Sequence, residues 1–123
     1  MNILIDTHIF LWLAGDVKRV SKRYMDYLED LDNEIYLSSI SIAEIMIKKS
    51  IGYLEFEGDI LKILDEMGIK LLDFDAKSAL QLGSLPFYHR DPFDRMIISQ
   101  AISKNYKIIT VDKKFEKYKC EIL

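Results

Sequence analysis

The sequence predicts an α/β fold, a three-layer α/β/α sandwich around a mostly parallel central sheet. Short apolar runs alternate along the chain with amphipathic segments, and no linker rich in Pro, Gly or Ser divides it. Strands that alternate with helices require crossover connections, which produce parallel strands with helices on both faces of the sheet. We therefore expect one continuous α/β domain spanning residues 1–123.

Four apolar runs are expected to form the strands, and a fifth strand is expected at the C-terminus. The run at 3–5 is apolar throughout, as in a strand that is buried on both faces. The other expected strands are 34–37, 70–74, 107–111 and 120–123.

The segments between these runs have helical periodicity. Tyr24, Leu28 and Leu31 form one apolar stripe, and the segment 91–104 is the best helix, with apolar residues spaced at i, i+4 and i+8. The expected helices are 7–14, 21–31, 40–50, 59–66, 76–82 and 91–104, followed by a helical turn after residue 112.

Composition excludes several classes of protein. Half of the 123 residues are hydrophobic, which argues against disorder, and a net charge of −3 argues against a strongly basic nucleic-acid-binding surface. Cys120 is the only cysteine, so an internal disulfide is impossible and a reducing compartment is favoured. No apolar run approaches the roughly 20 residues of a membrane span, and no signal peptide is apparent. We expect a cytoplasmic protein with no membrane partner.

Acidic residues occur where a parallel sheet would gather them. Asp6 ends the first expected strand, Asp112 ends the fourth, and Glu44 interrupts an apolar helix that follows the second. Asp91 and Asp94 begin the best helix. Ligands of such sheets bind beyond the carboxyl ends of the strands, so these side chains are the first candidates for a site.

Each of these acids also has a purely structural explanation. Asp91 before Pro92 is typical of a helix start, and Asp94 at the third helical position suits the helix dipole. Asp6 and Asp112 are both placed to cap a following helical turn.

Glu44 has two structural explanations of its own. Ser41 and Glu44 have the spacing of a capping box, in which the glutamate would only satisfy a backbone N–H. Lys48 lies four residues further on, so a surface ion pair is the other explanation.

Taken together, the carboxylates predict a cation site. Several carboxylates at one edge repel one another unless a cation compensates, and oxygen ligands favour Mg²⁺ or Mn²⁺. Zinc is disfavoured because Cys120, His8 and His89 are the only soft ligands and have no ligand spacing. A carboxylate-held Mg²⁺ is the usual apparatus for attack of water on a phosphate.

Four strings of residues stand out along the chain, in this order: Leu4-Ile5-Asp6-Thr7-His8, Ser41-x-x-Glu44-Ile45, His89-Arg90-Asp91-Pro92-Phe93-Asp94-Arg95 and Ile108-Ile109-Thr110-Val111-Asp112-Lys113-Lys114-Phe115. In this order and spacing they resemble the PIN-domain family of metal-dependent nucleases, and within it the VapC-like toxins of type II toxin–antitoxin pairs. The resemblance covers essentially the whole chain.

The resemblance implies roles for individual residues. The family's acidic quartet, which is both catalytic and metal-binding, falls on Asp6, Glu44, Asp94 and Asp112. Asp91 competes with Asp94 for the role of the third acid. Otherwise Asp91 is the N-cap of the helix and orients Asp94. Thr7 and Thr110 correspond to hydroxyl positions that orient a carboxylate or a water, although local hydrogen bonds explain them equally well.

Basic and aromatic residues give weaker indications. Arg90, Arg95, Lys113 and Lys114 flank the acidic edge, and either contact RNA phosphates or form a solvated charged rim. His89 is expected to be a hydrogen-bonded loop histidine rather than a proton donor. Phe10 and Trp12 indicate core or interface rather than a platform for bases.

The implied function is that of an endoribonuclease toxin, which hydrolyses RNA by metal-activated water and leaves a 5′-phosphate and a 3′-hydroxyl. The resemblance also implies a homodimer and an antitoxin whose tail occupies the acidic groove. The alternatives are a stand-alone PIN nuclease in RNA processing and a receiver-like or adapter module whose acids are only caps. A phosphatase with an aspartyl nucleophile is disfavoured, because Asp-x-Asp is expected there and position 8 is His.

Overall fold

The computed structural model describes residues 1–123, and its five strands form one sheet in the order β3-β2-β1-β4-β5. All four strand pairs are parallel, so the predicted α/β class is confirmed. The strands are β1 (Asn2–Ile5), β2 (Glu34–Ser38), β3 (Lys70–Leu72), β4 (Lys107–Ile109) and β5 (Glu121–Ile122).

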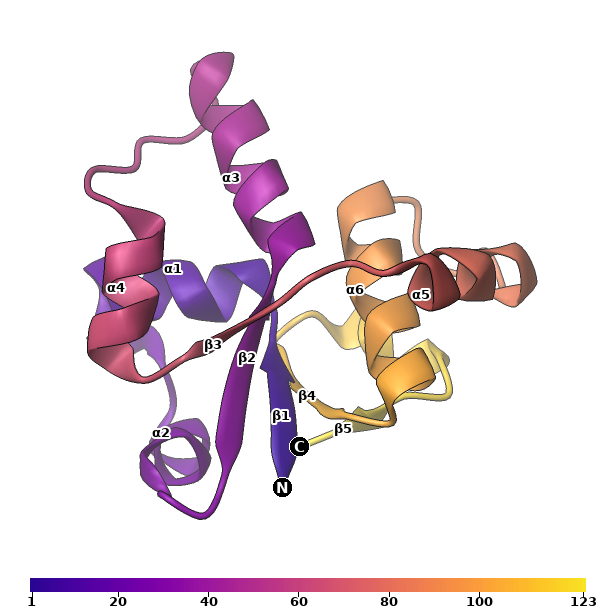
Figure 1. The fold of residues 1–123 in the computed structure, drawn as a ribbon, viewed down its shortest axis with the longest axis horizontal. Coiled ribbons are helices and arrows are strands. Elements are labelled where there is room, and N and C mark those ends of the chain that lie inside the picture. Colours follow the sequence, from indigo (N-terminus) through magenta and orange to yellow (C-terminus); the bar gives the residue numbers. More distant parts are fainter.

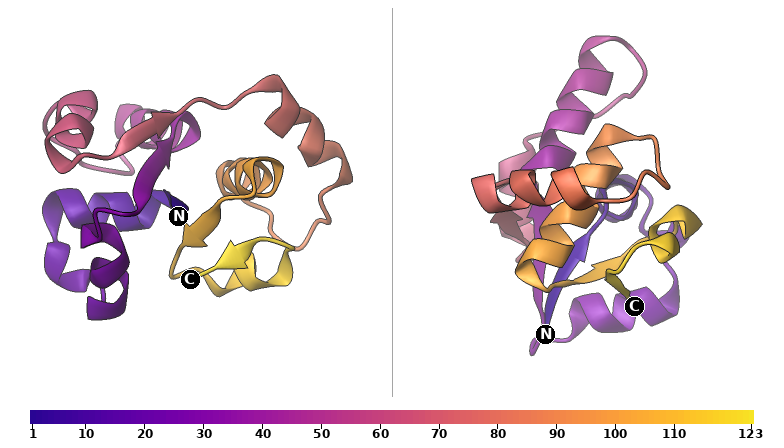
Figure 2. Two further views of the ribbon diagram at one scale, coloured as in Figure 1. Left: turned by 60° about the horizontal axis from the view of Figure 1, so that its bottom comes forward. Right: turned by 90° about the vertical axis from the view of Figure 1, so that its right-hand side faces the viewer.

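Helices cover both faces of this sheet (Figures 1 and 2). The α-helices are α1 (Thr7–Gly15), α2 (Lys22–Glu29), α3 (Ser39–Ser50), α4 (Ile60–Met67), α5 (Ala76–Gln81) and α6 (Pro92–Lys104). Three short 3-10 helices, η1 (Val17–Arg19), η2 (Leu82–Ser84) and η3 (Lys113–Lys117), complete the chain. None of the helices is both long and apolar enough to cross a membrane.

The alternation of side chains along the strands divides the core into two clusters. Ile3 and Ile5 of β1 pack into one cluster with α1, α3 and α4, whereas Leu4 packs into the other with α6 and η3. All three side chains are fully buried. Successive residues of a strand point to opposite faces, so a strand that is apolar at every position requires helices on both sides. The three-layer sandwich follows from this.

The order of the strands creates a crevice between β1 and β4. The chain moves from β1 outward to β2 and β3, and then returns to place β4 and β5 on the other side of β1. This reversal is a topological switch point, where helices leave in opposite directions and ligands bind in open α/β sheets. The Asp6 N–H donates to the Ile109 carbonyl at 3.1 Å and ties the two strand ends together.

Several elements are shorter than the sequence predicts. β3 ends at Leu72 rather than at residue 74, and the Phe74 N–H donates instead to the Ser39 hydroxyl at 3.0 Å. β4 ends at Ile109 rather than at residue 111, and the next carbonyl, that of Thr110, accepts from the Tyr24 hydroxyl at 2.9 Å. The second helix ends at Glu29 rather than at residue 31.

Candidate functional site

Asp6 lies at the crevice because it directly follows β1. Its side chain is buried, with Oδ1 accepting the Ile9 N–H at 2.8 Å as the N-cap of α1. Oδ2 accepts the Thr110 hydroxyl at 2.5 Å. The cap alternative is therefore confirmed for Asp6, but capping occupies only one of its two oxygens.

Asp112 divides its two oxygens in a similar way. Oδ1 accepts the Lys114 N–H at 2.9 Å as the N-cap of η3. Oδ2 lies 2.9 Å from Nε2 of His89. The Asp112 N–H donates to the Thr110 hydroxyl at 3.0 Å, so Thr110 contacts both acids. Capping and a functional role are compatible for both aspartates.

Glu44 is not part of a capping box, and that alternative is wrong. The N-cap of α3 is Ser38, whose hydroxyl accepts the Ile40 N–H at 3.0 Å. Ser41 lies inside the helix and is fully buried. Glu44 is therefore beyond the first turn. Its Oε1 accepts the Thr7 hydroxyl at 2.8 Å, and that hydroxyl also lies 2.9 Å from the hydroxyl of Ser41.

The expected ion pair between Glu44 and Lys48 is present, but one partner is buried. Lys48 Nζ lies 2.5 Å from Glu44 Oε2, and the side chains are 39% and 8% exposed respectively. This hydrogen bond raises the pKa of Lys48 above its ordinary value. The pair therefore places a positive charge at the edge of the acidic group.

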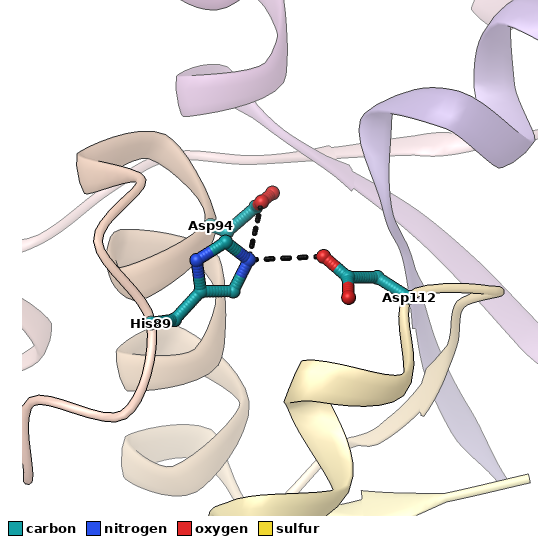
Figure 3. A group of neighbouring side chains, drawn as sticks. All are labelled: His89, Asp94 and Asp112. Atoms are coloured by element: carbon teal, nitrogen blue, oxygen red, sulfur yellow. Dashed lines mark hydrogen bonds and ion pairs between the residues drawn. The ribbon is translucent and has the colours of Figure 1, made fainter.

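The start of α6 places the remaining two acids. Asp91 is the N-cap, as expected, and its Oδ1 accepts the N–H groups of Phe93 and Asp94 at 2.8 and 3.2 Å. Pro92 occupies the first turn, where its missing N–H costs nothing. Asp94 is in the same turn, and its carboxylate lies beside the ring of His89, which also faces Asp112 (Figure 3).

His89 lies between Asp94 and Asp112 (Figure 3). Its Nε2 is 3.0 Å from Asp94 Oδ2 and 2.9 Å from Asp112 Oδ2. The ring nitrogen and the two carboxylate oxygens all lie within 4.8 Å of one another. The sequence correctly suggested a hydrogen-bonded loop histidine. It did not indicate this position between two acids, for which the only signal was proximity to Asp91.

Burial and mutual repulsion shift the pKa values of the acids. Burial is the main cause of the raised pKa of Asp6. Burial, followed by the charge of Asp91, raises the pKa of Asp94 to about 7, and the charges of Glu44 and Asp6 add to this effect. Burial alone would raise the pKa of Asp112, but hydrogen bonds from the Lys114 N–H and from His89 hold it below its ordinary value.

The four expected acids lie close enough for their charges to interact. The charges of Glu44 and Asp6 act on Asp94, and the charge of Asp112 acts on Asp6. Such a group is unfavourable without a compensating positive charge. The available donor atoms are mainly carboxylate oxygens, which suit a hard divalent cation such as Mg²⁺ or Mn²⁺. The donor set therefore fits the cation that the sequence predicts.

The basic residues beside the acids differ in whether the protein already binds their charged groups. The Arg95 guanidinium donates to the Pro86 carbonyl at 2.9 Å and lies 4.5 Å from the centre of the Phe87 ring. It therefore holds the loop before α6. Arg90, Lys113 and Lys114 are exposed.

The two aromatic residues of α1 do not form an exposed platform for bases. Phe10 is fully buried in the core, and Trp12 is partly buried against it.

Two surface hollows flank the acidic group. One is lined by Thr7, His8, Leu11, Glu44, Ile45, Lys48, Tyr53 and Leu54. The other is lined by Arg23, Tyr24, Thr110, Val111, Asp112, Lys113, Glu116, Ile122 and Leu123. The first hollow contains Glu44 and the second contains Asp112.

Comparison with solved structures finds close similarity in fold. VapBC2 from Rickettsia felis, solved bound to a DNA fragment from its promoter, matches with a TM-score of 0.77 and 23% identity over 100% of this chain and 98% of the other. VapBC-1 from nontypeable Haemophilus influenzae matches with a TM-score of 0.73 and 22% identity over 100% and 97%. FitAcB from Neisseria gonorrhoeae matches with a TM-score of 0.68 and 21% identity over 98% and 96%.

Sequence comparison identifies the family. None of the curated proteins matches the chain. The model of the PIN domain, however, matches residues 3–119, which include every acid of the crevice. The fold, the topology and this match agree, and the chain belongs to the PIN-domain family.

Proposed function

We propose that the chain is a metal-dependent endoribonuclease and the toxin component of a toxin–antitoxin pair. One observation carries the proposal: carboxylates from β1, α3, α6 and the turn after β4 converge at the β1–β4 crevice. Burial at this crevice raises the pKa values of Asp6 and Asp94, and the charges of neighbouring acids raise them further. Nuclease activity is also the general property of PIN domains, the family to which the chain belongs.

Asp6, Glu44, Asp94 and Asp112 would hold one or two Mg²⁺ or Mn²⁺ ions, directly or through water. When bound, the cation would lower the pKa of a water molecule and neutralise charge developing on the scissile phosphate. Three neighbours would orient these carboxylates, each through a hydrogen bond described above: Thr7 to Glu44, Thr110 to Asp6, and the Asp91 cap to the N–H of Asp94.

Contact with RNA phosphates is assigned to Arg90, Lys113 and Lys114. These side chains are exposed beside the crevice, and Arg and Lys supply many backbone contacts to nucleic acids. Arg95 was a fourth candidate from the sequence. Because its guanidinium is held by the loop, we assign it a supporting role, in which it keeps that loop beside the start of α6.

The partner is proposed to be a small antitoxin, in a cytoplasmic complex built on a homodimer of this chain. The structural neighbours are toxin–antitoxin complexes. An antitoxin side chain with a positive charge would neutralise the acids as a cation does. Lys48 is an intramolecular example of such an interaction, because its ammonium group pairs with the buried Glu44.

Cleavage of RNA by the purified protein tests the proposal. We expect cleavage with Mg²⁺ or Mn²⁺, loss of cleavage in chelator, recovery on adding Mn²⁺, and products with a 5′-phosphate. Asp6→Asn should remove cleavage without lowering the melting temperature in chelator, because Asn keeps the cap and relieves a buried charge. Full cleavage in chelator, or an active Asp6→Asn, would overturn the proposal.

Asp59→Asn is the matched control, since Asp59 also caps a helix but is exposed and lies at α4, away from the crevice. It should leave cleavage unchanged. Mn²⁺ should also stabilise the wild-type fold by about 2.7 kcal/mol at 100 times Kd, because it binds only the folded state. Co-expression of the product of a neighbouring gene separates a toxin from a stand-alone nuclease, since only an antitoxin would restore growth.

A further inference from the structure

Both ring nitrogens of the buried His89 make hydrogen bonds, and the two bonds differ in kind. Nδ1 accepts the Asp91 N–H at 3.2 Å. Nε2 faces carboxylate oxygens of Asp94 and Asp112 at 3.0 and 2.9 Å. The ring therefore has a donor at one end and only acceptors beyond the other.

This arrangement determines the tautomer. A nitrogen that accepts a hydrogen bond from an amide carries a lone pair and no proton. Nδ1 is therefore unprotonated, and Nε2 carries the proton that faces the two carboxylates (Figure 3). A protonated ring nitrogen cannot bind a metal, because metal ligation uses the neutral nitrogen's lone pair. The proximity of His89 to two acids is thus explained without ligation.

The ring is held in place by the segment that follows Asp112. The His89 N–H donates to the Tyr118 hydroxyl at 2.7 Å, and the ring lies edge-on to Phe115, with centroids 6.1 Å apart and an interplanar angle of 77°. Phe115 is fully buried in η3, which Asp112 caps. The loop before α6 is therefore held against the segment after β4 by two contacts, one through the backbone of His89 and one through its ring.

We propose that His89 is a positioning residue that fixes Asp94 and Asp112 relative to each other through its Nε2–H, and that it is not itself a ligand of the cation. This inference rests on the proposed function of the site. The hydrogen bond from Nε2 goes to Oδ2 of Asp112, and Oδ2 of Asp94 lies 3.0 Å from the same nitrogen. Oδ1 of Asp94 then remains available, and the shared donor holds together two like charges that would otherwise separate.

Removal of the Nε2–H donor should lower the affinity for the cation while the protein still folds. Hydrogen-bonding partners of metal ligands typically contribute 10–100-fold in metal affinity or activity. We expect His89→Asn to bind Mn²⁺ about 10–100-fold more weakly, because its amide reaches only the position of Nδ1. The amide of His89→Gln reaches the position of Nε2 and can still donate to the acids, so its affinity should stay within a few-fold of wild type.

Two measurements made without RNA test the inference. Calorimetric titration with Mn²⁺ compares wild type, His89→Asn and His89→Gln. Nitrogen-15 NMR of the imidazoles reports the tautomer, and a His8→Gln variant leaves His89 as the only histidine signal, since the chain has two histidines. We expect the Nε2–H tautomer in chelator and again after addition of Mg²⁺.

The outcomes separate this inference from the proposed function. An Nδ1–H tautomer, loss of the Nε2 proton on adding Mg²⁺, or equal Mn²⁺ affinity in wild type and His89→Asn would each overturn the role of His89, whether or not the protein cleaves RNA. If His89→Asn does not fold, the tautomer of wild type and the affinity of His89→Gln still decide. Failure of wild type to bind Mn²⁺ would overturn the proposed function itself.

Discussion

The hydroxyl of Thr110 donates a hydrogen bond of 2.5 Å to Oδ2 of Asp6, a residue 104 positions earlier in the chain. The hydroxyl oxygen of Thr110 also accepts the backbone N–H of Asp112 at 3.0 Å. Asp6 follows β1 and Thr110 follows β4, which are neighbours in the sheet. One hydroxyl therefore couples the two acids at the topological switch point.

Thr110→Val should separate this coupling from the shape of the side chain. Valine fills the same space but leaves Oδ2 of the buried Asp6 without its donor, while Oδ1 still accepts the Ile9 N–H. We expect the free energy of unfolding in chelator to fall by about 1–3 kcal/mol, measured by urea denaturation, and RNA turnover to fall with it. Thr110→Ser keeps the hydroxyl and should retain most of both. Stability and turnover of Thr110→Val equal to wild type would show that the bond is incidental.

Glu44→Gln tests the carboxylate of α3. The amide oxygen of glutamine can still accept the Thr7 hydroxyl, so the local structure should persist. The negative charge, however, is lost from the group that would hold the cation. We expect turnover of RNA to fall about 100-fold or more, which is roughly 2.7 kcal/mol of transition-state stabilisation.

Glu34→Gln is the control for Glu44→Gln. Glu34 also pairs with a lysine, Lys70 at 3.0 Å, but it lies at the amino end of β2 and is exposed. Its turnover should equal that of wild type. If both variants cleave at the wild-type rate, Glu44 has only the structural role of holding Thr7 and Lys48.

The position at which α3 begins illustrates what the sequence could and could not predict. Ser38, Ser39 and Ser41 are all acceptable N-caps, so local preference does not choose among them. The choice depends on tertiary structure, because the Ser38 hydroxyl also bonds the side chain of Gln100, 62 residues away. The capping box of Ser41 and Glu44 was wrong for this reason.

The convergence of the acids was more predictable than their partners. Apolar runs followed by Asp6 and Asp112 indicate strand ends, and parallel strands place those ends together. The contact of His89 with Asp94 and Asp112 depends on how the loop before α6 packs against Phe115 and Tyr118. No periodicity in the sequence encodes that packing.

Stability of the metal-free protein should depend on pH in an unusual direction. The pKa of Asp94 is raised from 3.8 to about 7, and that of Asp6 is raised as well. Between pH 3.8 and about 7, Asp94 is protonated in the folded state and ionised in the unfolded state. The free energy of unfolding therefore rises as the pH falls from 8 toward 5. The lowered pKa of Asp112 has its effect only below 3.8, outside this window.

Melting temperatures in chelator at pH 5.5 and pH 8 check this prediction. Wild type should melt at the higher temperature at pH 5.5, and Mg²⁺ should stabilise the protein most at pH 8, where the acids are ionised. In Asp94→Asn much of the difference between the two pH values should disappear, with the remainder due to Asp6. An identical pH dependence in wild type and Asp94→Asn would contradict the assigned titration.

Asp91 and Asp94 differ by one helical turn, and their hydrogen bonds predict which of them serves the cation. Oδ1 of Asp91 already accepts the N–H groups of Phe93 and Asp94 as the cap of α6. The carboxylate of Asp94 does not cap the helix, and its ion-pair contact is with Nε2 of His89. Asn is as good a cap as Asp, so Asp91→Asn should fold normally and keep Mn²⁺ affinity and RNA turnover within about tenfold of wild type.

Asp94→Asn should behave in the opposite way. It removes an unfavourable buried charge, so its melting temperature in chelator at pH 8 should equal or exceed that of wild type. Its RNA turnover should nevertheless fall about 100-fold or more, because a carboxylate is lost from the group that would hold the cation. If instead Asp91→Asn loses cleavage while Asp94→Asn retains it, the third acid of the site is Asp91, and Asp94 contributes only the favourable interaction of an acid with the first turn of α6.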